Sequence, residues 1–325
     1  MQGAVFTRFG PPEVLRVQRL VRPQPRAGEV LIRGIATTVT AACTLMRRGD
    51  TLLSRLVLGL FRPRKRFQVA GIEFAGVIEA VGRGVSDWTP GQRVFGFAGI
   101  RSGPYAQYFC LPASASLAPM PQGVDYAEAA TLVDGPTTAI HFLDKLANLR
   151  PRERLLVIGA SGSVGGAAVQ VGRSLGATVV GVCSTPNVEL VRSLGAHAVI
   201  DYTKEDFTRG HQQYDVIFDA VTKSTFAACK RCLAPGGRYL PTGIRMWDYV
   251  LMAWTRLVGR RRVICGLSTE KRDALGEVED LLARGELRPV IDRRYPLARI
   301  SDAHRYVDTG RKRGNVVIEM EEPRT

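Results

Sequence analysis

The stretch Leu155-Leu-Val-Ile-Gly-Ala-Ser-Gly-Ser-Val-Gly-Gly-Ala-Ala-Val-Gln170 decides the fold of this chain. A short apolar run, typical of a buried strand, breaks into glycines, and an Ala/Val-rich helical pattern follows it. A dinucleotide site needs this order: Gly159 allows a tight turn, Gly162 lets backbone amides approach a pyrophosphate, and Gly165 lets the helix pack closely on the strand. The N–H groups at the start of the helix attract phosphate. The cofactor-binding residues predicted in this turn are Gly159, Ser161, Gly162, Ser163, Val164 and Gly165.

Further short apolar runs follow the glycine turn and predict strands separated by helix-length segments. Strands that alternate with helices pair in parallel through right-handed crossovers. The sequence therefore predicts an α/β fold with a doubly wound parallel sheet, the Rossmann arrangement. The predicted strands after the first cover residues 177–183, 198–201, 214–219, 236–240 and 263–267, with a helix over roughly 187–194.

The end of the second predicted strand bears on the choice of dinucleotide. Proteins that prefer NAD usually place Asp or Glu there, bonded to the ribose 2′-hydroxyl. Here the segment reads Cys183-Ser-Thr185, without a carboxylate to repel a 2′-phosphate. Ser184, Asn187 and Tyr202 could donate hydrogen bonds to such a phosphate, although Ser184 could instead only cap the next helix. NADPH is therefore the expected cofactor, with NADH as the alternative.

Several segments, in order along the chain, carry a resemblance to a known family. They are Gly71-Ile-Glu-Phe-Ala-Gly-Val-Ile-Glu-Ala-Val-Gly82, Gly103-Pro-Tyr-Ala-Gln-Tyr108, Arg192-Ser-Leu-Gly-Ala-His-Ala-Val-Ile-Asp-Tyr202 and Gly314-Asn-Val-Val-Ile318. Together they resemble the medium-chain dehydrogenases/reductases, and within them the zinc-free quinone oxidoreductase-like branch. The resemblance covers essentially all 325 residues.

This resemblance implies a domain layout and part of a site. A GroES-like, mostly β substrate domain is expected over residues 1–122 and 290–325, and the Rossmann domain over 123–289. A length of 325 residues with 45% hydrophobic content suffices for two cores. The family also implies that Thr138 and the backbone at Gly243 and Leu267 lie near the nicotinamide. Relatives are often dimers joined through the nucleotide domain, so a homodimer is expected.

The departures from the family's zinc-dependent members concern the metal ligands. At the early Cys and the His of a "G-H-E" triplet, this chain has Thr40 and Ile72, and only Glu73 of the triplet remains. Asp134 lies near the third position. Zinc needs several N, S or O ligands that converge, and isoleucine offers none. The region that would hold four cysteines for a structural zinc contains only Cys110. No zinc is therefore predicted.

Without a metal to polarise a simple carbonyl, substrates that accept hydride readily are favoured. These are quinones and α,β-unsaturated carbonyls, in which conjugation spreads the charge. The protein would hold the reactants together and exclude water. Thr40 and Tyr105 are the candidate hydroxyl donors, with no essential general acid expected. Cys43 and Trp247 are predicted to line the substrate pocket.

The cysteines predict little chemistry. Cys229 and Cys232 have redox spacing, but they are expected late in a helix and facing the core. Cys183 and Cys265 are expected within strands and buried. Free thiols without a signal peptide predict a cytoplasmic protein.

Two apolar stretches and the net positive charge allow further interpretations. Residues 52–61 run into Arg62-Pro-Arg-Lys-Arg66, and residues 246–258 precede Arg260-Arg-Arg262. Each could lie on an anionic membrane surface, helped by the net charge of +15, or could line a greasy pocket or subunit interface. The arginines are scattered, which argues against nucleic acid as a partner. An NADPH-sensing or nucleic-acid-binding protein with little catalysis is nevertheless retained as the alternative function.

Overall fold

The computed structural model describes residues 1–99, 103–243, 245–269 and 271–320, without the side chains of Leu52 and Leu53. The chain divides into two compact units. One comprises Met1–Asp134, Glu270–Gly276 and Pro289–Thr325, and the other comprises Gly135–Thr269 and Glu277–Arg288. The sequence prediction drew the first boundary at 122/123, whereas the first unit extends to Asp134.

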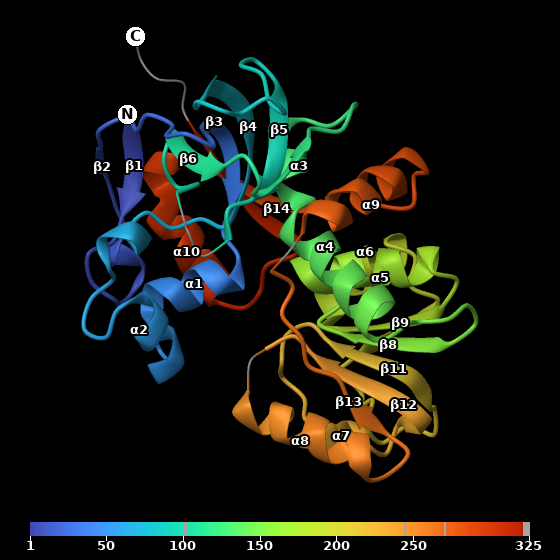
Figure 1. The fold of residues 1–325 in the computed structure, drawn as a ribbon. Helices are drawn as coiled ribbons and strands as arrows, with labels where there is room; N and C mark the ends of the chain where they lie inside the picture. Colours follow the sequence, from blue (N-terminus) through green and yellow to red (C-terminus); the bar gives the residue numbers. More distant parts are fainter. Residues whose placement is uncertain (100–102, 244, 270, 321–325) are drawn as a thin grey trace. The chain divides into compact units, whose positions relative to one another are not determined.

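The first unit is built on a mostly antiparallel sheet in the order β14-β15-β3-β4-β5-β7, with β6 also paired to β3 (Figure 1). A separate pair, β1-β2, is antiparallel. The strands are β1 Gln2–Val5, β2 Arg16–Arg19, β3 Glu29–Thr38, β4 Glu73–Val81, β5 Arg93–Phe97, β6 Tyr108–Pro112, β7 Ser116–Pro119, β14 Ile291–Pro296 and β15 Asn315–Glu319. The helices are α1 Ala41–Arg48, α2 Leu52–Leu58, α3 Tyr126–Thr131 and α10 Ile300–Asp308, with short 3-10 turns at Pro12–Val14, Lys65–Phe67 and Leu297–Arg299.

The register of the first unit places residues from distant parts of the chain beside one another. β15 pairs with the end of β3, so Val317 lies opposite Thr38, and β3 pairs along most of its length with β4. One core lies between this sheet and α1 and α10, and it includes Phe6, Phe67 and Ile318. A second core lies inside the curved sheet, around Phe74 and Phe109. The arrangement is a GroES-like domain.

The second unit is a six-stranded parallel sheet in the order β10-β9-β8-β11-β12-β13. α5 and α6 cover one face, and α7 and α8 cover the other (Figure 1). Because helices cover both faces, β8 is buried along nearly its whole length and reads as an unbroken apolar run. The Rossmann prediction is confirmed. The strands are β8 Arg154–Ile158, β9 Thr178–Cys183, β10 Ala198–Asp201, β11 Tyr214–Asp219, β12 Leu233–Pro241 and β13 Arg262–Val263. The helical segments are α4 Asp134–Ile140, a π-helix His141–Leu146, α5 Ser163–Ser174, a 3-10 turn Thr185–Asn187, α6 Val188–Ser193, α7 Phe226–Cys229, α8 Met246–Leu257 and α9 Arg272–Ala283, which ends in this unit.

Two details of the second unit correct the sequence prediction. The sixth strand, expected over 263–267, ends at Val263. The Cys265 N–H donates to Met252 Sδ (3.4 Å) and not to a strand carbonyl, so Cys265 lies beyond the strand and is only half-buried. Cys232 lies in the turn after α7 and not within a helix. Both Cys229 and Cys232 are nevertheless fully buried in the core, as predicted.

Candidate functional site

The glycine turn between β8 and α5 has the geometry that a phosphate-binding turn needs. Gly159 has φ +79°, a conformation that L side chains rarely adopt. A Cβ at Gly165 would lie 2.1 Å from the Gly159 carbonyl oxygen, so the helix passes too close to the turn for any side chain. Gly162 differs, because the nearest atom to a Cβ there is 3.5 Å away. Gly162 is also the N-cap of α5, and no side chain caps the helix. The start of α5 therefore has room for a ligand.

Asn187 joins this turn to the end of β9. Its side chain is buried, and Nδ2 donates to Ser161 Oγ (3.2 Å) and to Ser184 Oγ (3.1 Å). Its Oδ1 is buried without a hydrogen-bond partner. A buried acceptor that lacks a donor is destabilising by about 1–3 kcal/mol, which a ligand hydroxyl or amide would recover. Ser184 precedes the 3-10 turn without capping it, so its hydroxyl is not used as a cap. These contacts fit a dinucleotide beside the turn.

A carboxylate stands beside the end of β9, which the sequence of that strand did not indicate. Asp201 ends β10 and pairs in register with Cys183. Its Oδ2 accepts from Thr185 Oγ1 (2.5 Å), and its Oδ1 accepts from the backbone N–H (3.0 Å) and hydroxyl (2.7 Å) of Thr203. The hydrogen bond from Thr185, followed by those from Thr203, lowers the pKa of Asp201. Tyr202, the neighbouring predicted residue, is 60% exposed.

The remaining predicted residues of the second unit lie on three different segments. Thr138 is buried on α4. Gly243 follows β12 and lies so close to Thr222 that a Cβ would be 2.4 Å from its Oγ1. Leu267 lies beyond β13 and is 53% exposed, and Trp247 lies on the first turn of α8 and is 67% exposed.

In the first unit, Thr40 and Cys43 are joined by two hydrogen bonds at the start of α1. Thr40 is the N-cap, and its Oγ1 accepts from the Cys43 N–H (3.2 Å) and donates to Cys43 Sγ (3.3 Å). Cys43 and Tyr105 are both fully buried in the core between the sheet and the helices. Burial raises the pKa of each. Thr40, which is 8% exposed, is the least enclosed of the three side chains.

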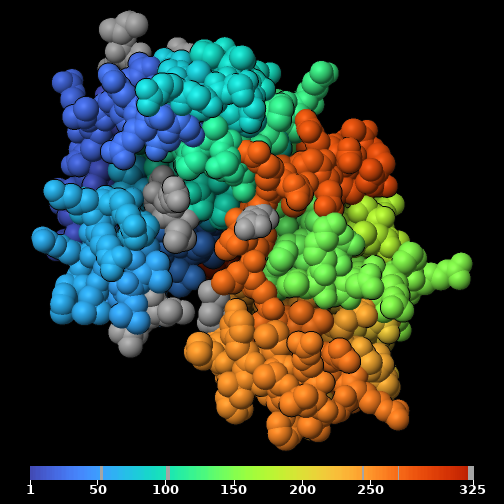
Figure 2. All heavy atoms as spheres, in the orientation of Figure 1, coloured from blue at the N-terminus to red at the C-terminus, as the bar shows by residue number. Residues whose placement is uncertain are grey.

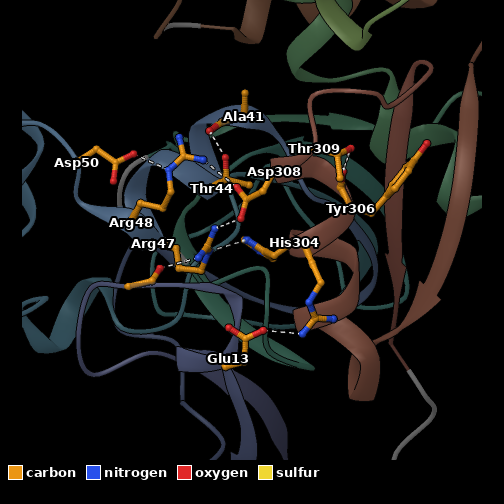
Figure 3. Close-up of polar contacts among 12 residues, drawn as sticks. Glu13, Ala41, Thr44, Arg47, Arg48, Asp50, His304, Tyr306, Asp308 and Thr309 are labelled. Carbon is orange, nitrogen blue, oxygen red and sulfur yellow. Dashed lines mark hydrogen bonds and ion pairs between the residues drawn. The ribbon is translucent and has the colours of Figure 1, made fainter.

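Tyr105 is held by a buried polar network that the sequence did not reveal. Figure 3 shows its members Arg47, His304 and Asp308. Arg47 Nε donates to His304 Nδ1 (3.3 Å), and His304 Nε2 lies 3.1 Å from Tyr105 Oη. Because a guanidinium can only donate, Nδ1 must accept, so Nε2 carries the proton and donates to Tyr105. The Tyr105 hydroxyl therefore donates onward, toward the Thr38 carbonyl at 3.3 Å. Burial, reinforced by the Arg47 charge, lowers the pKa of His304 to about 3.

The other end of this network reaches the surface through Asp308. Arg47 pairs with Asp308 Oδ2, and Arg48 Nη1 binds Oδ1 of the same carboxylate (2.8 Å). Arg47 Nη1 also donates to the Gly10 carbonyl (2.5 Å). Arg47 is thus a fully buried cation. Its charge is balanced by the Asp308 carboxylate of α10, which Arg48 of α1 also binds. The sequence held no signal for it, since Arg47 and Asp308 are 261 positions apart.

A second charged cluster occupies the region where zinc-dependent relatives hold metal. Glu73 accepts from the Thr38 hydroxyl and from the Asp134 N–H (2.6 Å), and burial with the nearby Asp134 charge raises the pKa of Glu73 to about 8. Asp134 forms an ion pair with the fully buried Lys271 (3.0 Å). Ile72 is a buried core residue. Among the described residues, His, Cys, Asp and Glu side chains form no group of three that could hold a metal ion.

Comparisons with known proteins agree with this architecture. The family model described as "Alcohol dehydrogenase GroES-like domain" matches residues 26–122, and the one described as "Zinc-binding dehydrogenase" matches residues 194–318. The chain is 31% identical to the "Quinone oxidoreductase" of Rattus norvegicus, over 98% of this chain and 97% of that protein. It is 28% identical to the "NADPH-dependent alkenal/one oxidoreductase, chloroplastic" of Arabidopsis thaliana, over 98% of this chain and 79% of that protein.

A solved structure gives the same result at the level of the whole fold. The quinone oxidoreductase from Coxiella burnetii superposes with a TM-score of 0.88 and 26% identity, covering 99% of each chain. Fold and sequence thus agree along the whole length. The chain belongs to the medium-chain dehydrogenase/reductase superfamily of oxidoreductases, in its quinone oxidoreductase-like branch.

Proposed function

We propose that this protein is an NADPH-dependent, zinc-independent oxidoreductase that reduces a quinone or an α,β-unsaturated carbonyl compound. The observation that carries the proposal is the open start of α5 at Gly162, flanked by the buried, unpartnered Oδ1 of Asn187. The names of two relatives, a quinone oxidoreductase and an alkenal/one oxidoreductase, support the substrate class.

The second unit supplies the proposed cofactor site. The amides at the start of α5 would hold the pyrophosphate, Asn187 Oδ1 would accept a hydrogen bond from the adenosine ribose, and the Ser184 hydroxyl would donate to the ribose or its 2′-phosphate. When bound, the reduced nicotinamide supplies a hydride. NADH is the alternative cofactor, because Asp201 places a negative charge beside Thr185. The proposed cofactor residues are Thr138, Gly159, Ser161, Gly162, Ser163, Val164, Gly165, Ser184, Asn187, Tyr202, Gly243 and Leu267.

Zinc independence is supported by what occupies the ligand positions. Ile72 offers no donor atom, and Asp134 is already paired with Lys271. A metal-free site favours acceptors whose conjugation stabilises the developing charge. Thr40 is the favoured hydroxyl to orient the substrate oxygen, because the Tyr105 hydroxyl is enclosed between His304 and Thr38. Cys43 and Trp247 remain the proposed pocket residues. A cytoplasmic homodimer completes the proposal.

A turnover assay tests the proposal. Purified protein is mixed with NADPH and a panel of quinones, enals and enones, and loss of NADPH absorbance is followed alongside metal analysis of the same sample. Turnover with at least one acceptor class and no stoichiometric zinc is expected. Tight NADPH binding without any turnover would instead favour an NADPH sensor, and failure to bind either nucleotide would reject the proposal altogether.

A further inference from the structure

Helix α8 exposes most of its apolar residues and buries two polar ones, Asp248 and Thr255. Asp248 and Thr255 are each only 4% exposed, whereas Trp254 is 61% exposed and Leu257 is 86% exposed. In Figure 2, residues 246–262 (orange) lie at the surface of the face shown. The arrangement is the reverse of an ordinary surface helix, which faces the core with its apolar side. The exposed apolar residues of α8 are Met246, Trp247, Val250, Trp254 and Leu257.

The orientation of α8 is fixed by specific contacts. Thr255 Oγ1 accepts the N–H of Val263 in β13 (3.0 Å), and Met252 Sδ accepts the N–H of Cys265 (3.4 Å). Leu251 and Met252 pack against the core beneath. The outward stripe is therefore built into the fold. Its members at positions 247, 250, 254 and 257 follow the three-and-four spacing of one helix face.

Arginines without acidic partners accompany this stripe. Arg256, Arg260 and Arg262 are exposed, and among the described residues none of the three forms an ion pair. Other surface arginines of the chain are paired, such as Arg294 with Asp125 (3.0 Å) and Arg305 with Glu13 (2.6 Å). The α8 face thus combines tryptophan, aliphatic side chains and uncompensated positive charge.

Exposed apolar residues also lie beside basic ones in the first unit, at the end of α2 and just beyond it. Phe61 is 88% exposed, Leu56 57% and Leu60 46%. The basic residues that follow, Arg62, Arg64, Lys65 and Arg66, are all exposed and form no ion pair within the part of the chain that the structure describes. Two separate segments therefore combine exposed apolar residues with basic ones.

We propose that the α8 face, with Arg256, Arg260 and Arg262, docks on the surface of an anionic lipid bilayer. Tryptophan and arginine are the side chains that suit the boundary between acyl chains and headgroups. Among the described helices, none has the length and apolarity to cross a bilayer, so the contact is peripheral.

A second copy of the chain fits the α8 face less well. In a two-fold symmetric interface the same patch lies on both sides, so this face would bring three arginines from each copy and no exposed carboxylate of α8, since Asp248 is buried. An anionic headgroup surface neutralises them instead. Trp247 belongs both to this face and to the proposed substrate pocket, so the test uses Trp254, Leu257 and the arginines.

Vesicle flotation of the full chain tests the inference. The expected result is binding to phosphatidylcholine vesicles that contain phosphatidylglycerol, weakened by salt, and no binding to phosphatidylcholine alone. Brominated lipid should quench the tryptophan fluorescence, and the W254F variant should lose part of that quenching, because Trp88 is buried. Failure to float at low ionic strength, or absence of quenching, overturns the proposal.

Matched variants separate a specific contact from the overall charge. The R256Q/R260Q/R262Q variant should bind anionic vesicles on the order of a hundredfold more weakly, at about 1 kcal/mol per arginine. The W254S/L257S variant should also bind more weakly. The control R83Q/R150Q/R311Q removes the same charge from exposed arginines elsewhere and should change binding less than about twofold. Equal losses in the two arginine variants would show attraction by net charge alone and would reject the α8 assignment.

Discussion

At the scale of single residues, the three glycines of the turn differ in what a side chain would meet. Gly162 has an ordinary φ of −82°, and a Cβ there would make only an ordinary contact, 3.5 Å from the Gly159 carbonyl oxygen, whereas Gly165 lies against the backbone of the turn. Packing within the protein therefore tolerates a side chain at Gly162 and excludes one at Gly165. The fold therefore requires glycine at position 165, whereas at position 162 only a bound ligand would require it.

Gly162→Ala should therefore leave the free energy of unfolding within about 0.5 kcal/mol of the wild-type value. Its methyl group would occupy the space proposed for the pyrophosphate, so NADPH should bind at least roughly tenfold more weakly, a loss of about 1.4 kcal/mol. Gly165→Ala is the contrasting variant, because its Cβ would clash at 2.1 Å and lower stability. Urea denaturation and NADPH titration measure both effects. Wild-type NADPH affinity in Gly162→Ala would place the nucleotide elsewhere.

His304 links a single protonation state to stability. Its pKa is about 3 in the folded protein because it is buried beside Arg47, while an unfolded histidine titrates near about 6.5. Below that value, the unfolded chain binds a proton that the folded chain does not. The stability from neutral His304 is thus complete above about pH 6.5 and declines as the pH falls toward the folded pKa.

The non-titrating variant His304→Gln isolates this contribution. Between about pH 7.5 and about pH 5, the wild type should lose about 2 kcal/mol more unfolding free energy than the variant. Urea denaturation at a series of pH values provides the measurement. Parallel pH profiles for the two proteins would mean that His304 is not held neutral.

At the scale of secondary-structure elements, strand register decides what surrounds the end of β9. The parallel pairing of β9 with β10 brings Asp201 beside Thr185, although the residues of β9 itself end without a carboxylate. Selectivity between the two dinucleotides therefore depends on a neighbouring strand. The Ser184 hydroxyl favours a 2′-phosphate and the Asp201 charge opposes it, while the unpartnered Asn187 Oδ1 is an acceptor that suits a ribose hydroxyl.

Asp201→Asn should tighten NADPH binding by a factor of roughly five and leave NADH binding unchanged. The variant removes one negative charge near the proposed 2′-phosphate. The repulsion between the two groups, screened by solvent, is about 1 kcal/mol, and the asparagine amide can still form hydrogen bonds with Thr185 and Thr203. Asp206→Asn is the control, since Asp206 likewise caps a local turn through Thr208. Titrations of the wild type, Asp201→Asn and Asp206→Asn with NADPH and with NADH measure these affinities. A weaker affinity for both nucleotides in Asp201→Asn would assign Asp201 a purely structural role.

At the scale of the whole molecule, the first unit is assembled from three separate stretches of chain. Asp134 ends the first stretch and Lys271 belongs to the second, and their buried ion pair joins the two. Lys271 Nζ also lies 4.8 Å from the centre of the Phe97 ring. Removal of one partner leaves the other charge buried without compensation.

Asp134→Asn should accordingly lower the free energy of unfolding by about 3 kcal/mol, because it leaves the fully buried Lys271 charge without this partner, and the Asp134→Asn/Lys271→Met pair should restore most of that loss. The surface pair of Arg284 with Glu286 (2.8 Å) offers a comparison, because Arg284→Met should change stability by less than about 1 kcal/mol. Denaturation curves of the wild type, Asp134→Asn, Lys271→Met, the double variant and Arg284→Met measure these differences. An additive double variant would show that Asp134 and Lys271 do not stabilise each other.

The sequence by itself determined the Rossmann unit and the roles of its glycines, because those depend on short-range sterics: a positive φ at Gly159 and a close approach at Gly165 are properties of adjacent residues. It also predicted the burial of Cys229 and Cys232 and the apolar character of α8. It extended the sixth strand too far, because after Ile264 the chain leaves the sheet and the Cys265 N–H bonds to Met252 of α8.

Only the tertiary structure decided the surroundings of Tyr105, the pairing of Asp134 with Lys271, and the carboxylate beside Thr185. It also decided that α8 turns its apolar face outward, since the Thr255 contact with β13 fixes the rotation of that helix. Each of these depends on partners brought together by strand register and helix packing. Such partners lie far apart in the chain, and no local pattern encodes which of them will meet.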